Sequence, residues 1–156
     1  MKGDKKVLQA LNSCLKDQLT AINQLFLHAR MTKDWGLPAF DKHEYKCSIH
    51  AMKMADSLIE RILFLEALPN LQDLGKLHIG EDVPEILAAD IEMLLSIRTN
   101  QQDSMLLCEQ AKDYITRDIL EEMLEKTEEY IDWCETQQWL VKNIGIENYL
   151  QSQTGE

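Results

Sequence analysis

Glycine and proline are rare in this chain, and they leave three long stretches in which nothing interrupts a helix. The 156 residues include 6 Gly and 3 Pro, and residues 4–35, 39–68 and 85–144 contain neither. These two residues are the least favourable ones inside a helix. The uninterrupted stretches are longer than an average globular helix, so we expect a bundle of long helices.

Apolar residues recur at helical spacing within these stretches. Asp82 is expected to cap the third helix, with Pro84 in its first turn, and Gly145 is expected to end the fourth. The expected helices cover about 4–35, 39–66, 84–110 and 113–143, followed by a short fifth helix in the string IENYLQSQ (146–153).

The segment ALPNLQDLGKLHIGEDVP, residues 67–84, separates the second expected helix from the third. It contains three glycine or proline breaks before Pro84, and it is too long for a tight turn. Four long helices with one long crossover after the second match a ferritin-like four-helix bundle. We therefore predict an all-α fold with a short fifth C-terminal helix, built as a single domain over residues 1–156.

The charge balance favours some partners over others. The chain carries 27 acidic and 16 basic residues, a net charge of -11, which repels nucleic acid and anionic membranes and suits cations. No apolar run approaches the ~20 residues of a membrane span, and the start lacks the apolar core of a signal peptide. We expect a cytoplasmic protein with no nucleic-acid or membrane partner. Its four cysteines form no CxxC pair and are expected to be reduced, mostly in the core: Cys14, Cys47, Cys108 and Cys134.

The string SIHAMKMADS places Met52 and Met54 on opposite faces of the second expected helix, at 100° per residue. A bundle helix needs one apolar face for its own core, so a second face must be covered by another subunit or by a flat ligand. Periodicity alone leaves open a plain dimer seam or a seam that also holds a cofactor. The Met54 face carries Cys47, Ala51, Leu58 and Leu65, and the Met52 face carries Tyr45, Ile49, Asp56, Ile59 and Leu63.

The strings QLTAINQLFLHARM, WGL, IERILFLEALPNLQDLGKLHIGEDV and NYLQSQ closely resemble bacterioferritin over nearly the whole chain. The resemblance implies a cage of twenty-four subunits that stores iron as a ferric mineral, with haem b shared between two subunits at each two-fold interface. Met52 matches the family's axial haem ligand. The positions that resemble the rest of the haem pocket are Leu19, Ile22, Asn23, Phe26, Tyr45, Ile49, Lys53, Ala55 and Asp56.

Symmetry and ligand chemistry agree with that role for Met52. A two-fold interface presents the same patch twice, so a methionine on the axis meets its own copy, and two thioethers can hold one iron. Thioether is a soft ligand that favours the reduced metal, and axial ligands are a main control on haem potential.

The family's di-iron ferroxidase centre has lost its ligands in this sequence. The chain contains no Glu-x-x-His pair, and neutral groups cannot balance two ferrous ions in a low-dielectric core. We expect these positions to form a mainly apolar core in which the polar ones need hydrogen-bond partners. The six iron-ligand positions correspond to Gln18, Ala51, Met54, Leu94, Thr127 and Tyr130.

Other family features carry over to charged positions that could equally be ordinary surface. Lys46 replaces a histidine that can bind iron on the inner surface. The positions that resemble a three-fold channel are Glu109, Asp118 and Glu121, those of another iron route are Asp34, Glu66 and Asp132, and those of a docking patch for bacterioferritin-associated ferredoxin are Leu68, Pro69, Glu81 and Glu85.

The sequence therefore predicts a haem-binding cage subunit that supports electron transfer to the stored mineral and has no ferroxidase activity of its own. Such a chain would depend on a ferroxidase-competent bacterioferritin subunit as a partner. Three alternatives stay open: an active ferroxidase with unusual ligands, a purely structural cage subunit without haem, and a binding module unrelated to iron.

Overall fold

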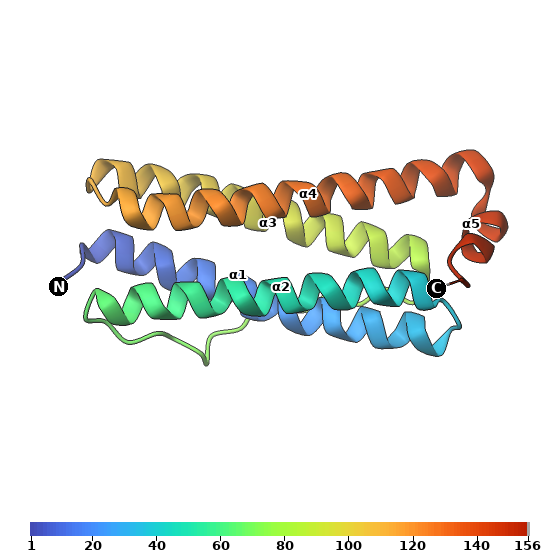
Figure 1. The fold of residues 1–156 in the computed structure, drawn as a ribbon, viewed down its shortest axis with the longest axis horizontal. Coiled ribbons are helices and arrows are strands. Elements are labelled where there is room, and N and C mark those ends of the chain that lie inside the picture. Colours follow the sequence, from blue (N-terminus) through green and yellow to red (C-terminus); the bar gives the residue numbers. More distant parts are fainter. Residues whose placement is uncertain (156) are drawn as a thin grey trace.

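The computed structural model describes residues 1–155, and these residues form five helices joined by one long crossover (Figure 1). The all-α prediction and the order of the elements are confirmed. No helix in this part of the chain combines the length and the apolar character that a membrane crossing requires. The helices are α1 (Lys5–Asp34), α2 (Pro38–Phe64), α3 (Val83–Gln110), α4 (Tyr114–Ile144) and α5 (Ile146–Ser152).

The four long helices pack as two antiparallel hairpins, and α5 lies at one end of the bundle (Figure 1). Most contacts join α1 to α2 and α3 to α4, with fewer between α1 and α3, while α2 and α4 touch at few points. The α2–α4 side is therefore the least closed side of the bundle.

Local sequence fixes the helix ends much as expected. The Asp82 side chain accepts a hydrogen bond from the Glu85 N–H at 2.9 Å, with Pro84 in the first turn of α3. Asp4 and Asp113 cap α1 and α4 in the same way. Gly145 has a φ of 85°, a left-handed conformation that glycine adopts without strain, and it separates α4 from α5. Most ends lie within about one residue of the expected positions, and α2 differs most: it begins at Pro38, because proline is tolerated at the first helical position, and it ends at Phe64, two residues before the expected end.

Three buried clusters fill the bundle from the N-terminal end to the α5 end. Leu11, Leu15 and Leu58 belong to the first, Ala21 and Ile97 to the middle one, and the third surrounds the fully buried Tyr149 of α5. All four cysteines are free and buried, as expected. Each fully buried large apolar side chain contributes on the order of 2–3 kcal/mol to the free energy of unfolding, so the three buried clusters stabilise the bundle.

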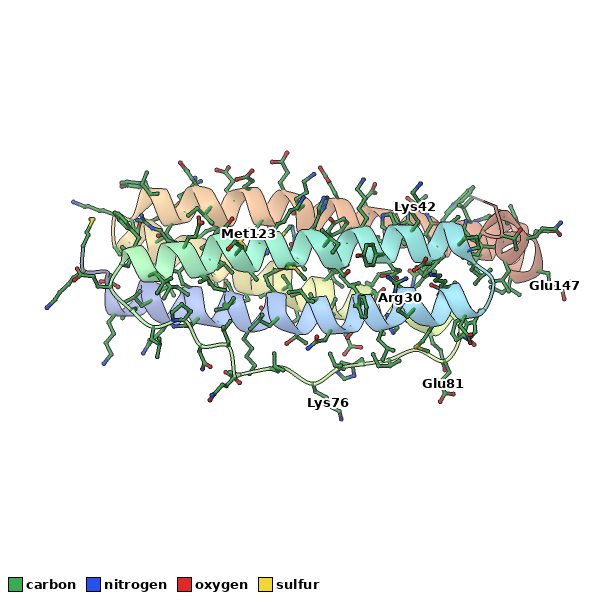
Figure 2. All side chains as sticks on the ribbon, turned by 60° about the horizontal axis from the view of Figure 1, so that its bottom comes forward. Arg30, Lys42, Lys76, Glu81, Met123 and Glu147 are labelled. Carbon is green, nitrogen blue, oxygen red and sulfur yellow. The ribbon has the colours of Figure 1, made fainter. Side chains whose placement is uncertain are left out.

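The crossover runs along α1 and is tied to it by side chains (Figure 2). Four side chains on one side of α1 each accept a hydrogen bond from a backbone N–H of the crossover. The pairs are Asn70 N to Asn12 Oδ1 (2.9 Å), Gly75 N to Thr20 Oγ1 (2.8 Å), His78 N to Gln24 Oε1 (3.1 Å) and Gly80 N to His28 Nε2 (3.0 Å).

Candidate functional site

The six positions predicted from the family's di-iron centre meet around one small internal cavity. They come from all four long helices, and the cavity of about 10 Å³ is the size of roughly one water molecule. Its other walls are apolar or thiol side chains from the middle core cluster. The lining residues are Gln18, Ala21, Leu25, Cys47, Ala51, Met54, Leu94, Ile97, Thr127 and Tyr130.

Two of the three polar side chains at these positions have hydrogen-bond partners. The Thr127 hydroxyl donates to the carbonyl of Met123 at 3.0 Å, one helical turn back. The Tyr130 hydroxyl contacts the Nδ1 atom of His50, and burial, followed by the nearby Cys47 thiol, raises the pKa of Tyr130. Gln18 is buried and makes no side-chain hydrogen bond within residues 1–155. The six positions around the small cavity therefore form a largely packed core.

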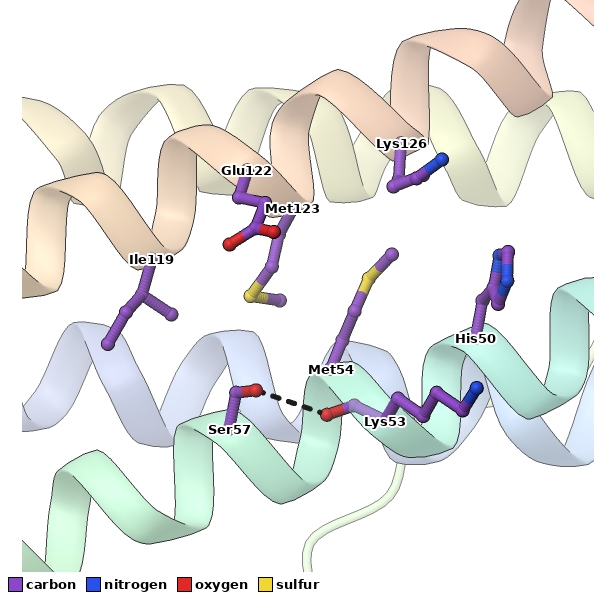
Figure 3. A pocket seen from close by; sticks show the side chains of 8 residues that line it. All are labelled: His50, Lys53, Met54, Ser57, Ile119, Glu122, Met123 and Lys126. Atoms are coloured by element: carbon purple, nitrogen blue, oxygen red, sulfur yellow. Dashed lines mark hydrogen bonds between the residues drawn. The ribbon is translucent and has the colours of Figure 1, made fainter.

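A wider hollow of about 260 Å³ opens between α2 and α4, where these helices touch least (Figure 3). Met54 points into it from α2 and Met123 from α4, so the hollow holds two thioethers, one from each helix. Met54 also lines the small cavity, so its side chain forms part of the wall of both spaces. The remaining lining residues are His50, Lys53, Ser57, Ile119, Glu122 and Lys126.

The face of α2 opposite Met54 is exposed, as the periodicity predicted. Met52 is 53% exposed there, with Phe26 of α1 46% and Tyr45 39% exposed. The rings of Phe26 and Tyr45 lie 6.3 Å apart, and the Arg30 guanidinium covers both at 5.2 Å and 4.9 Å. Arg30 was not predicted from the sequence. Met52, Phe26 and Tyr45 therefore form an exposed, largely apolar surface, and the Arg30 guanidinium lies beside its two aromatic rings.

The predicted haem-pocket positions do not all lie on that surface. Asn23 and Asp56 are exposed, and Leu19, Ile22 and Ile49 are half-buried. Ala55 is buried in the first core cluster. Lys53 lines the hollow between α2 and α4, with its side chain running along α2 (Figure 3). Within one chain, the side chains of Ala55 and Lys53 therefore lie away from the exposed thioether of Met52.

The three predicted channel carboxylates are brought together by a residue that the sequence analysis missed. Arg117 contacts Glu109 at 2.8 Å, Glu121 at 3.1 Å and Asp118 at 3.6 Å. Its spacing from Glu121, i to i+4 on a helix, is the signal that could have revealed it. One cation thus offsets part of the negative charge of this group.

Other predicted groups are not assembled within one chain. Leu68 is 84% exposed and follows α2, whereas Glu81 lies at the opposite end of the bundle, before α3 (Figures 1 and 2). Glu85 has a local role, because its carboxylate accepts the Glu81 N–H at 2.7 Å. Glu66 pairs with the N-terminal ammonium at 2.8 Å, far along the bundle from Asp34 at the end of α1.

A buried polar cluster that the sequence analysis did not single out joins His28, Glu44 and Asp90. Their ligand atoms lie within 4.8 Å of one another. His28 Nε2 accepts the Gly80 N–H, so the ring carries its hydrogen on Nδ1 and donates it to Asp90 Oδ1 at 2.9 Å. Gln24 donates to the same oxygen at 3.0 Å. Burial, and then the neighbouring Asp90 carboxylate, holds the pKa of Glu44 well above its usual range.

This architecture is that of a ferritin-like protein, and the Ferritin-like domain family matches residues 8–144. The chain is 41% identical to a bacterioferritin of Brucella melitensis over 97% of this chain and 94% of the relative. It is also 41% identical to a bacterial ferritin of Synechocystis sp. (98% and 99% covered) and 37% identical to a bacterioferritin of Mycobacterium avium (96% and 94%). The chain therefore belongs to the bacterioferritins, an iron-storage family.

Proposed function

We propose that this chain is a haem-binding bacterioferritin subunit without ferroxidase activity, which builds a twenty-four-subunit cage in the cytoplasm as a single ferritin-like domain. The observation that carries the proposal is the chemistry of the six positions around the small cavity. None of them is a carboxylate or an imidazole, and together they leave room for about one water molecule.

Ferrous ions need charged oxygen ligands to bind inside the bundle, at the small cavity. Two ferrous ions bring four positive charges into a low-dielectric core, where unpaired charge is strongly unfavourable. The only polar groups offered by the six positions are an amide, a hydroxyl and a phenol, at Gln18, Thr127 and Tyr130. The thioether of Met54 is a soft ligand that suits oxidised iron poorly. Rapid iron oxidation in the cage would thus come from a ferroxidase-competent bacterioferritin subunit that assembles with this one.

The exposed face of α1 and α2 supports haem binding. A flat, largely apolar cofactor fits a surface that combines an exposed thioether with aromatic and aliphatic side chains, and that no part of the chain covers between residues 1 and 155. Met52 and its symmetry copy would hold the haem iron, while Phe26, Tyr45, Ile22 and Ile49 would contact the ring. When bound, the haem supplies one-electron transfer to the stored ferric mineral.

Met52 and Met54 give a matched test of the haem assignment. Met52→Leu should abolish the haem absorbance of the purified cage, because it removes the one axial ligand from each chain. The swap nearly conserves volume, so assembly should persist. Met54→Leu is the control and should leave the spectrum unchanged. Haem that survives Met52→Leu, or disappears with Met54→Leu, would contradict the assignment of the two faces.

Iron oxidation tests the second half of the proposal. A cage made of this chain alone should oxidise ferrous iron little faster than buffer does, as followed by ferric absorbance in stopped flow. Replacing all six positions together by four Glu and two His is the complementary variant. Fast oxidation of about two ferrous ions per unmodified chain, with no second subunit present, would overturn the claim that this subunit is silent.

A further inference from the structure

Two buried carboxyl groups, Glu44 of α2 and Asp90 of α3, lie within hydrogen-bond reach of each other. Their side chains are 2% and 0% exposed. Oε1 of Glu44 and Oδ2 of Asp90 receive no hydrogen bond from an N–H group of residues 1–155. Ionised carboxylates are acceptors only, so the two groups can bond to each other only if one of them carries a proton.

His28 cannot balance a second negative charge, because both of its ring nitrogens have fixed roles. Nε2 accepts the Gly80 N–H at 3.0 Å and therefore carries no hydrogen, while Nδ1 donates to Asp90 Oδ1 at 2.9 Å. The ring is thus neutral. Gln24, also neutral, donates to the same oxygen at 3.0 Å. Two donors point at Asp90, so Asp90 is the carboxylate of the pair and Glu44 is the acid.

The other titratable groups that face the pair are uncharged at neutral pH. Burial, followed by nearby Lys46, lowers the pKa of His43 to about 4. Lys46 itself is exposed to solvent. Burial raises the pKa of the thiols and phenols around the pair, which are Cys47 on α2, Tyr130 and Cys134 on α4, and Tyr149 on α5.

The space beside the pair is too small for solvent to stabilise a second charge. Glu44 and Asp90 line a cavity of about 10 Å³, which holds about one water molecule. Two ionised carboxyl groups in contact would repel each other more strongly here than in water, because the surroundings have a low dielectric constant. Burial, and then the Asp90 carboxylate, accordingly holds the pKa of Glu44 well above its usual range.

We propose that Glu44 carries a proton at neutral pH and that this proton is a pH-sensitive latch for the crossover. The latch runs from Glu44 through Asp90 and His28 to the Gly80 N–H. When the proton leaves, either the two carboxylates repel each other or His28 takes up a proton from solvent. A protonated His28 has a hydrogen on Nε2 and no longer accepts the Gly80 N–H. Both events loosen the crossover at Gly80, and neither involves haem or iron.

The direction of the pH effect follows from proton linkage. An opening that exposes the cluster to water lets Glu44 ionise near its ordinary pKa of 4.5, whereas the closed form keeps the proton to a higher pH. Opening is therefore favoured as the pH rises. In hydrogen exchange corrected for the intrinsic rate, protection of the Gly80 amide should fall by up to tenfold per pH unit between about pH 6 and pH 8.

The Asn70 amide is the control within the same crossover. It donates to Asn12 Oδ1, an acceptor that does not titrate, so its protection should stay constant over this range. Glu44→Gln is the test variant, because its amide can donate to Asp90 at any pH. In Glu44→Gln cages the protection of Gly80 should no longer change with pH. Size-exclusion elution and circular dichroism show that the variant keeps its fold.

Infrared spectroscopy of the intact cage detects the proton itself. A protonated carboxyl group has a carbonyl stretch above the amide band, where ionised carboxylates do not absorb. Wild type should show this band at neutral pH and lose it in alkali, and Glu44→Gln should lack it. Glu129→Gln, at an exposed carboxylate paired with Lys126, should keep it.

Two results would overturn the latch. One is a neutral-pH spectrum in which the acid band is missing from wild type or persists in Glu44→Gln. The other is a protection of the Gly80 amide that depends on pH in the same way in wild type and in Glu44→Gln.

Discussion

Gly80 lies where the crossover is pressed against the first turn of α3, and the structure predicts that Gly80→Ala is strongly destabilising. A Cβ atom at this position would lie 2.3 Å from the backbone nitrogen of Ile86 and 2.6 Å from the carbonyl carbon of Glu85. These are backbone atoms of a capped helical turn and cannot rotate away. The crossover must therefore move outward, and the Gly80 N–H then loses its hydrogen bond to His28 Nε2.

The cost can be worked out from these contacts. A buried acceptor left without its donor costs about 1–3 kcal/mol, and displacement of the segment adds strain, so we expect a loss of about 2–4 kcal/mol. For a chain of this length that corresponds to roughly 5–15 °C in melting temperature. Differential scanning calorimetry at matched concentration measures it.

Gly75→Ala is the matched control within the same crossover. The three atoms nearest to its Cβ would all belong to the Thr20 side chain, the closest at 3.1 Å, and a side chain can shift by a few tenths of an ångström. The expected change is below ~1 kcal/mol. The reasoning would be refuted if Gly80→Ala melted at the wild-type temperature, or if Gly75→Ala were equally damaging.

Three further predictions follow from the charged and exposed positions. Arg117→Gln should speed ferrous uptake by cages that contain a ferroxidase-competent subunit if the three carboxylates around it guide iron. The gain should vanish at high salt, and Arg98→Gln, whose partner is Glu128, should show none. Asp113→Asn should cost about 1–3 kcal/mol at neutral pH in denaturant titrations. Burial opposes the charged form, but hydrogen bonds from Thr116 and the contact with Arg61 outweigh it and hold the pKa of Asp113 below 3.8. This stabilisation is present above pH 3.8 and is lost as the pH falls through the lower pKa that Asp113 has in the folded protein. The difference in stability between Asp113→Asn and wild type should therefore disappear in acid. Leu68→Ala should slow iron release driven by bacterioferritin-associated ferredoxin more than release by a small chemical reductant, and equal slowing would remove the docking argument.

Features set by local spacing could be predicted from the sequence. The helix ends follow from caps such as Asp82 and from breaks such as Gly145, which act within a few residues of themselves. The opposite faces of α2 follow from a rotation of 100° per residue, which places Met52 outside and Met54 inside without any knowledge of the neighbouring helices.

Features assembled from distant parts of the chain could not be predicted in the same way. His28, Glu44 and Asp90 come from three helices, and no helical spacing relates them. The one local signal of this buried polar cluster is that Gln24 and His28 lie one helical turn apart on the buried side of α1, where most residues are expected to be apolar. The contact of Gly80 with α3 depends on how closely the crossover approaches that helix, which no residue pattern encodes.

The ties between the crossover and α1 set a lower limit on the length of this connection. Its anchoring positions run from Asn12 to His28, sixteen residues of helix, which is about 24 Å along the axis. The ten steps from Asn70 to Gly80 can reach at most about 33–36 Å, so the crossover exceeds this span by about 9–12 Å, the length of roughly three extended residues. Extra residues could loop outward into solvent without disturbing either end. Removing three residues would leave a reach of about 23–25 Å, barely enough for a fully straight segment. The hydrogen bond to Asn12 or the one to His28 would then be lost.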